Sequence, residues 1–408
     1  MDNLRLYEAD KDLAAVQRIW KEVGWVDSDT EAGFIKDLLL DSECLVGTID
    51  EQAECSVIWM PGRIHHLDSE LKLAVVAAVT TSHIARKSGF ASKLTAWSIQ
   101  RAAEQGCQVA ALGIFDQGYY DKFGFGCMSY EHELVFDPAL LNVPALERPP
   151  KRLSIIDFKS MHACLERRAS NHGGVFVDGD NKFKAELGWI ENGFGLGFFD
   201  EGELSHFIYC SSKGENGPLK IHWKAYSNAN QLLELLAVIK SLGDQVLSVQ
   251  MDQPAGIQLQ DLLDKPFRSR TISRNSVHHN RHWATAYWQL RILDLPGCMN
   301  KSSFNGSSCV FNLELEDPVS QYLSDRPGWQ GAAGQWRVSL GNTCTAEQGN
   351  DPTLETLRCS VNAFTRLWMG VVSASGLSVT DTLSASPALL AQLDALIRLP
   401  DTCAGYEF

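Results

Sequence analysis

Residues 73–91 read LAVVAAVTTSHIARKSGFA, and this stretch decides the fold. It begins as an apolar run rich in β-branched residues and then turns at RKSG, residues 86–89. The residues that follow, SKLTAWSIQRAAEQ, carry apolar side chains at helical spacing. The stretch therefore predicts a strand, a basic turn that contains glycine, and a helix. Because such a turn points backbone N–H groups and the positive end of a helix dipole at one spot, it suits a phosphate or pyrophosphate.

The flanking residues predict a mixed sheet around this unit. Segments 44–49 and 55–59 alternate like the strands of a hairpin, and residues 109–115 form an apolar strand after the helix. Residues 10–23 have the apolar spacing of an amphipathic helix. Up to residue 136 the predicted order is strand, helix, helix, three strands, helix, strand, helix, strand, with residues 130–136 as the last strand. This order predicts an α/β fold, a mixed sheet with helices on both faces.

The remaining chain predicts two further regions. The proline-rich segment 142–150 is the best candidate for a linker. Strand and helix signals then continue to residue 251 without another basic glycine turn, and from Trp288 the pattern changes to an antiparallel sheet flanked by helices. We therefore predict three domains, residues 1–148, 149–285 and 286–408. The segments expected as strands are 153–157, 219–225, 245–251, 290–295, 309–315 and 335–340, and those expected as helices are 158–169, 230–242, 353–368 and 388–397.

The composition excludes some classes of partner. The chain has 408 residues, which is enough for two or three domains, and its formal net charge of −14 argues against a nucleic-acid partner. Eleven cysteines without a Cys-x-x-Cys pair are typical of free thiols in a reducing cytosol. No apolar run approaches the roughly 18–20 residues of a membrane span. We therefore expect a cytoplasmic protein with no membrane or nucleic-acid partner.

The pattern Arg-x-x-Gly-x-Ala at residues 86–91 resembles the acyl-CoA-binding motif of the GNAT acetyltransferases. The turn would bind the pyrophosphate, and the strand edge at 79–81 would bind the pantetheine amides. Transfer from a thioester also needs an acid to protonate the leaving thiolate, and Tyr119 and Tyr120 are both candidates. The residues predicted to bind acetyl-CoA are Val79, Thr80, Thr81, Arg86, Lys87, Ser88, Gly89, Phe90, Ala91, Ser92, Phe115 and Asp116.

Other motifs have simpler explanations than chemistry. His278, His279 and His282 lie close together, but no cysteine or carboxylate near them in sequence completes a metal site, so we predict no metal. Asp27 beside Trp25 could hold an amine cation, although a polar loop that precedes a helix explains these residues more simply. No nucleophile elbow and no P-loop occurs in the chain.

Taken as a whole, the sequence resembles the Eis (enhanced intracellular survival) family of N-acetyltransferases. The resemblance covers nearly the full length and includes the VTTSHIARKSGFAS and YDKFGFG segments, the WQLRILDL strand and the final Glu-Phe. It implies tandem GNAT domains, a C-terminal sterol-carrier-like α+β domain and a hexamer. It also implies that Tyr120 is the general acid, that the terminal carboxylate of Phe408 is the general base, and that Glu407 binds a cationic substrate.

These observations predict an acetyl-CoA-dependent N-acetyltransferase that forms a ternary complex. The expected acceptor is an amine of a cationic small molecule, such as an aminoglycoside, a polyamine or an arylalkylamine, or a lysine. Acetyl-CoA is the expected co-substrate. The alternative is a lipid- or acyl-binding carrier or sensor built on a GNAT scaffold. The two differ in whether amines cause release of the CoA thiol.

Overall fold

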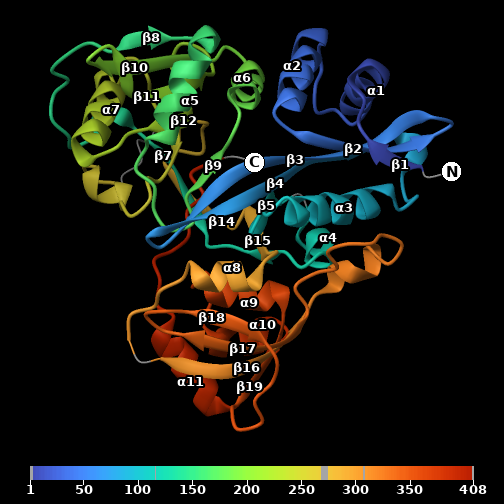
Figure 1. Cartoon of the computed structure of the whole chain (residues 1–408). Coiled ribbons are helices and arrows are strands. Elements are labelled where there is room, and N and C mark those ends of the chain that lie inside the picture. Colours follow the sequence, from blue (N-terminus) through green and yellow to red (C-terminus); the bar gives the residue numbers. More distant parts are fainter. Residues whose placement is uncertain (1–2, 115, 268–273, 307, 407–408) are drawn as a thin grey trace. The chain divides into compact units, whose positions relative to one another are not determined.

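The computed structural model describes residues 3–114, 116–267, 274–306 and 308–406 (Figure 1). The chain divides into two compact units. The first unit comprises Met1–Tyr130, Asn171–Asp178 and Ala286–Phe408, and the second comprises Glu131–Ser170 and Gly179–Thr285. None of the helices in the described ranges is both long and apolar enough to cross a membrane.

The first unit begins with the predicted succession of elements. The structure has β1 (Leu4–Leu6), α1 (Ala9–Glu22), α2 (Asp29–Leu40), β2 (Glu43–Ile49), β3 (Gln52–His66), β4 (Ser69–Thr81), α3 (Phe90–Glu104), β5 (Val109–Gly113), α4 (Gln117–Asp121) and β6 (Gly126–Cys127). Strand order in the sheet is β1-β2-β3-β4-β5-β15-β6, with β4 and β5 parallel, and β9 (Val175–Val177) also pairs with β3. The predicted strand–turn–helix unit is thus β4 and α3, and β3 and β4 are longer than expected.

Two strands lie in different sheets from those we predicted. The segment expected to close the first sheet is β7 (Glu131–Phe136), but it pairs with β13 (Val249–Asp252) and β14 (Arg281–Thr285) in the second unit. Its place is taken by β15 (Trp288–Ile292), which lies between β5 and β6 and is buried along its whole length. The alternation of apolar residues identifies both segments as strands, but the choice of partner depends on residues far away in sequence. The predicted domain ranges stay a prediction.

The two faces of the first sheet are covered by different helices. Leu94, Ile99 and other apolar residues of α3 pack with Val57 and Trp59 of β3. On the opposite face, Arg18 of α1 donates a hydrogen bond of 2.7 Å to Glu54 of β3. Successive strand residues point to opposite faces, so β3 contributes to both layers.

The second unit contains a seven-stranded sheet in the order β14-β7-β13-β12-β11-β10-β8. Its elements are β8 (Lys151–Leu153), α5 (Phe158–Glu166), α6 (Asp180–Gly188), β10 (Phe194–Asp200), β11 (Glu203–Ser212), β12 (Leu219–Ala225), α7 (Ala229–Ser241), β13 (Val249–Asp252) and β14 (Arg281–Thr285). Most predicted elements are present. The predicted strand 153–157 ends at Leu153 and continues as a 3₁₀ turn, because Ser154 and Asp157 cap that turn reciprocally. The predicted strand 245–251 begins only at Val249.

The end of the chain forms a five-stranded sheet in the order β18-β17-β16-β19-β20. Its elements are α8 (Leu295–Asn300), β16 (Cys309–Glu316), β17 (Gly334–Leu340), β18 (Thr345–Gln348), β19 (Thr356–Ser360), α9 (Val361–Trp368), α10 (Ala374–Thr380), β20 (Leu383–Ser384) and α11 (Pro387–Leu396). The predicted helix 353–368 is wrong in its first half. There, β19 runs parallel to β16, with Leu357 and Cys359 buried and Arg358 exposed. That alternation of period two is the signal that the helical interpretation overlooked.

Candidate acetyl-CoA site

The open edge of β4 is the first part of the candidate site. The parallel ladder between β4 and β5 runs from Leu73–Val109 to Val75–Ala111. Beyond it, β5 continues beside β15 through the pairs of Leu112 with Gln289 and Gly113 with Trp288, while β4 continues beside β3. The two parallel strands therefore separate after Val75. The edge of β4 that includes Val79–Thr81 can offer main-chain groups to an extended ligand.

A bulge in β4 changes the direction of this edge. Ser56 pairs with Thr80 and Ile58 pairs with Ala77, so Val57 of β3 faces both Ala78 and Val79. Ala78 adopts a left-handed backbone conformation, with a φ of 50°. A bulge re-aims the neighbouring backbone groups, and bulges are common next to active sites. The contacts of Val79–Thr81 with pantetheine amides stay a prediction.

The side chains of Thr80 and Thr81 already have partners inside the protein. The Thr80 hydroxyl lies 2.9 Å from the Ser56 hydroxyl, and the Thr81 hydroxyl lies 3.2 Å from Cys55 Sγ. Thr80 is also buried. Any contribution of these two threonines to the cofactor would therefore come from the main chain.

The turn between β4 and α3 is basic and exposed. Arg86, Lys87, Ser88 and Gly89 are all exposed. Lys87 and Gly89 have positive φ angles of 64° and 86°, and Gly89 is the N-cap of α3 without a side-chain cap. The first N–H groups of a helix have no partner within the helix, so this end of α3 offers donors and a partial positive charge. The Ser88 hydroxyl donates to the Ala85 carbonyl at 2.6 Å, so among the described residues 86–89 the side chains of Arg86 and Lys87 are left for a ligand.

The first turn of α3 lies against β2 and α4. A Cβ atom on Gly47 of β2 would come within 2.9 Å of the Phe90 ring, so glycine permits this close approach. The Ser92 hydroxyl accepts a hydrogen bond of 3.0 Å from Lys122 and lies 3.5 Å from the Tyr119 hydroxyl. The structure thus brings the predicted cofactor residues Phe90–Ser92 together with the segment that carries the two tyrosines.

The two tyrosines have different surroundings. The Tyr120 ring is buried in the core between the sheet and α3, and burial raises the pKa of its hydroxyl above the ordinary value. Tyr119 is half-buried, burial also raises its pKa, and Lys122 Nζ lies 3.8 Å from the centre of its ring. No described residue forms a hydrogen bond to the Tyr120 hydroxyl. Both phenols therefore stay protonated at neutral pH, as an acid must be.

Asp116 and Phe115 complete the predicted cofactor set. Asp116 is the N-cap of α4, and its carboxylate accepts a hydrogen bond of 3.4 Å from the Tyr119 N–H. The capping of α4 is enough to explain why an aspartate occurs at this position. Phe115 lies outside the described residues.

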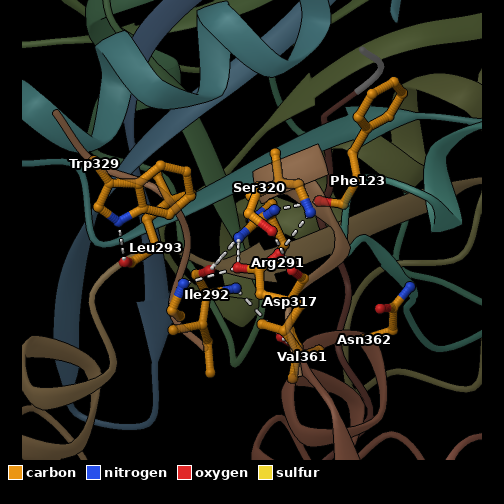
Figure 2. A network of polar contacts seen from close by, with 12 residues as sticks. Phe123, Arg291, Ile292, Leu293, Asp317, Ser320, Trp329, Val361 and Asn362 are labelled. Atoms are coloured by element: carbon orange, nitrogen blue, oxygen red, sulfur yellow. Dashed lines mark hydrogen bonds and ion pairs between the residues drawn. The ribbon is translucent and has the colours of Figure 1, made fainter. Parts of the chain in front are cut away.

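The turn that follows Tyr120 is held by residues that sequence reasoning missed. Arg291 of β15 is fully buried, donates to the Phe123 carbonyl, and forms an ion pair of 2.6 Å with the buried Asp317 (Figure 2). Asn362 of α9 donates to the carbonyls of Asp121 and Phe125 at 2.9 and 2.7 Å. The sequence carries no local signal for the burial of Arg291, because WQLRI alternates apolar and polar residues as a half-exposed strand does.

The segment that leads to the C-terminus lies in the same unit. Tyr406 is buried, and its carbonyl accepts a hydrogen bond of 2.8 Å from the Tyr287 hydroxyl. The Tyr287 carbonyl in turn accepts a hydrogen bond of 2.7 Å from the N–H of Ile114, the residue after β5. The chain is thereby brought to the end of β5, where β4 and β5 have separated. The predicted residues Glu407 and Phe408 lie outside the described residues.

Asp27 takes part, through its main chain, in the hydrogen bonding at the start of α2. Its N–H donates to Glu31 at 2.7 Å, and Ser28 and Glu31 form a capping box at the start of α2. Its carboxylate is exposed, and the neighbouring Trp25 is 50% exposed. The predicted binding of an amine by Asp27 stays a prediction.

Two of the three histidines in segment 278–282 have side-chain partners in the protein. His282 Nε2 lies 3.0 Å from His132 Nδ1, and His278 Nδ1 lies 3.1 Å from the Ser248 hydroxyl. Within the described part of the chain, no three potential ligands gather in a way that could hold a metal ion.

Comparison with known families identifies two regions. The profile described as Acetyltransferase (GNAT) domain matches residues 4–128, which include the open edge of β4 and the basic turn. The chain carries a GNAT acetyltransferase domain. The profile described as Sterol carrier protein domain matches residues 299–402. The predicted enzyme class and fold class are confirmed by these matches together with the mixed sheets and their flanking helices.

Solved structures share the fold along nearly the whole chain. A probable N-acyltransferase from Enterococcus faecalis superposes with a TM-score of 0.77 at 18% identity, covering 98% of this chain and 97% of the other. A GCN5-related N-acetyltransferase from Anabaena variabilis has a TM-score of 0.79 at 15% identity, covering 99% and 100%. Eis1 from Mycobacterium abscessus has a TM-score of 0.76 at 14% identity, covering 99% and 100%. The resemblance to the Eis family is thus confirmed as a likeness of fold. No curated protein matches the sequence.

Proposed function

We propose that this GNAT protein transfers the acetyl group of acetyl-CoA to an amine of a cationic small molecule or a lysine. The observation that carries the proposal is the uncapped start of α3 after the exposed Arg86 and Lys87, next to the edge of β4 that β5 has left. An acyl-CoA needs both features, because its pyrophosphate is anionic and its pantetheine arm carries amides that pair with a strand edge.

The proposed reaction is direct transfer in a ternary complex. The acceptor nitrogen forms a bond to the thioester carbonyl carbon, and the C–S bond breaks. The carboxylate of Phe408 accepts the proton that the amine loses, and the Tyr120 hydroxyl gives a proton to the departing sulfur. Main-chain N–H groups at Val79–Thr81 polarise the thioester carbonyl. The raised pKa of Tyr120 supports this role, since the phenol keeps its proton until the thiolate forms.

Thiol release in the presence of amines tests the activity. The full chain is mixed with acetyl-CoA and with aminoglycosides, polyamines, arylalkylamines or lysine peptides, and free CoA thiol is measured. We expect release that depends on at least one amine class. Acetyl-CoA binding without amine-dependent release from any of the four classes would contradict the proposal.

The two tyrosines provide a matched pair for the acid. We expect Tyr120→Phe to lower kcat by about 10²–10⁴-fold, the usual contribution of general acid–base catalysis. Tyr119→Phe removes the neighbouring hydroxyl and should leave kcat largely intact. Full activity of Tyr120→Phe would remove it from the mechanism, and the reverse result would assign the role to Tyr119.

One added residue after Phe408 tests the proposed base. The extension keeps every side chain but moves the terminal carboxylate, so kcat should fall while acetyl-CoA binding is unchanged. The described tail supports this proposal, because Tyr406 is held near the end of β5 by Tyr287. An unchanged kcat would exclude the carboxylate as base. Asp27→Asn and Glu407→Gln serve as the comparison, because they change residues proposed to bind the amine and leave the terminal carboxylate in place. These two substitutions should raise the KM of the amine, whereas the extension should lower kcat.

A lipid- or acyl-binding carrier is the second candidate, and the sterol carrier match at residues 299–402 favours it. Retention of lipid by the purified chain without amine-dependent thiol release would support the carrier. We also propose that the protein is cytoplasmic and assembles as a homohexamer, as its resemblance to the Eis family implies. The mass of the particle in solution tests the assembly.

A further inference from the structure

The aromatic rings in residues 119–125 pack against one another, and these contacts fix their relative positions. The rings of Tyr119 and Tyr120 meet edge to face with centres 5.0 Å apart. Phe123 lies 5.6 Å from Tyr119, and Phe125 lies 6.4 Å from Tyr120, both also in edge-to-face geometry. Phe123 and Phe125 are fully buried. The position of each tyrosine ring therefore depends on the conformation of the turn that joins them to the two phenylalanines.

The carbonyl groups of the same turn accept hydrogen bonds from residues far away in sequence. One amide group, Asn362 Nδ2, donates to the carbonyls of Asp121 and Phe125. Between these two points, Arg291 binds the Phe123 carbonyl, as Figure 2 shows. The start of α9 lies directly against the turn, because a Cβ atom on Gly126 would come within 2.7 Å of the Asn362 carbonyl.

We propose that Asn362 is a positioning residue for acetyl transfer. By binding both ends of the turn it holds the tyrosine rings at the start of α3, so the region matched by the sterol carrier profile serves the acetyltransferase site. The inference rests on the proposed function. A displaced acid protonates the thiolate poorly even when the cofactor still binds, so loss of Asn362 should lower kcat with little change in the KM of acetyl-CoA.

The chain contains a matched control for a purely structural role. Asn312 of β16 is buried, and its Nδ2 donates to the carbonyls of Asp351 and Leu354 at 2.7 and 3.3 Å. It thus makes the same kind of double contact as Asn362, but to a segment that holds no tyrosine. Asn362 is only half-buried, so its truncation leaves less unfilled space than truncation of Asn312.

The experiment compares Asn362→Ala and Asn312→Ala in the full chain. We expect kcat to fall by about 10–100-fold in Asn362→Ala only, with the KM of acetyl-CoA within about twofold of the unchanged chain. Amide hydrogen exchange of residues 117–126, which needs no turnover, should become faster in Asn362→Ala and not in Asn312→Ala. Asn362→Asp, which places an acceptor against two carbonyls, should lower kcat further.

In a chain that acetylates an amine, any one of three results would overturn the inference. They are unchanged exchange in residues 117–126, a kcat within about twofold of the unchanged chain in Asn362→Ala, or an equal loss of kcat in the two alanine variants. Absence of turnover in the unchanged chain with every amine would instead defeat the proposed function, and the exchange measurement distinguishes the two failures. Faster exchange would then show that Asn362 orders the turn for a purpose other than acetyl transfer, which also ends the inference.

Discussion

The two units each contain a parallel strand pair joined through a helix, and the two helices begin differently. In the first unit, β4 leads through the turn at 82–89 into α3, whose N-cap is Gly89 without a side-chain cap. In the second unit, β12 leads into α7 after only residues 226–228. There, Asn228 accepts a hydrogen bond of 3.1 Å from the Gln231 N–H, and the Gln231 side chain accepts one of 2.7 Å from the Ser227 N–H.

This difference shows that a few residues at the start of a helix decide whether a phosphate can bind there. Both crossovers supply a helix dipole that points at the strand ends, but in α7 the protein's own side chains already occupy part of the helix start. In α3 the start is left uncapped and two cations stand beside it. We therefore expect one cofactor site, in the first unit, although both units contain a crossover of this kind.

Charge reversal in the turn before α3 should cause the largest change in acetyl-CoA affinity. Arg86→Glu combined with Lys87→Glu replaces two exposed cations with anions, and the affinity for acetyl-CoA should fall by about 100-fold. The loss should be smaller at high salt, because salt screens exposed charges. Binding is measured by calorimetry. Lys220→Glu with Lys224→Glu changes the charge of β12 equally and should leave affinity within about twofold; an equal loss would mean that net charge alone is responsible.

Glycine replacement should give the next largest effect. Gly89→Ala adds a Cβ with no atom within 4 Å, so its cost comes only from the φ of 86°. A non-glycine residue in that conformation costs about 1–2 kcal/mol, and relaxation of the turn should weaken acetyl-CoA binding by about tenfold. Gly202→Ala, with φ 89° and equally open space in the β10–β11 hairpin, is the control. It should lower thermal stability without changing cofactor affinity.

Removal of the cap in the second unit should act on stability alone. Asn228→Ala deletes the acceptor for the Gln231 N–H and should cost about 1 kcal/mol of unfolding free energy, as for other N-cap truncations. Acetyl-CoA affinity should stay the same. Appearance of a second binding event would break the comparison, since an opened helix start would then suffice without cations.

Lowering the pH should produce the smallest effect, a loss of stability that should be similar in the two units. Burial alone would raise the pKa of Glu43, but the hydrogen bonds from Arg101, Trp59 and Gln105, together with the charge of Arg101, lower it. Arg148 and His206 lower the pKa of Glu234 in α7. Each carboxylate therefore contributes stability above its ordinary pKa near about 4.3, and this contribution is lost as pH falls through the lowered value.

Thermal unfolding of Glu43→Gln and Glu234→Gln measures that contribution. Each variant should be less stable than the unchanged chain at pH 7, by at most about 1 kcal/mol, and the difference should vanish towards about pH 3. A difference that persists in acid would show that the carboxylates act through packing and not through charge.

Local patterns could be predicted from the sequence, and distant partnerships could not. The β4–α3 unit was predictable because its apolar run, cations and glycine are contiguous. The place of β15 beside β5 was not, since pairing depends on residues more than a hundred positions away. The contacts of Arg291 with the Phe123 carbonyl and of Asn362 with the turn after Tyr120 have the same origin. The roles of Tyr120, Phe408, Asp27 and Glu407 stay predictions.

The position of β15 has a consequence for synthesis and for truncated fragments. Because β5 and β6 pair with β15 and not with each other, the ribosome must release residue 292 before the first sheet is complete. A fragment that ends near residue 130 has all the residues of the acetyltransferase match, yet it leaves β3, β5 and β6 without their partners β9 and β15, and the exposed strand edges invite aggregation. Expression of the acetyltransferase region alone therefore requires that both β9 and β15 be restored, β15 for example through a short linker after β6.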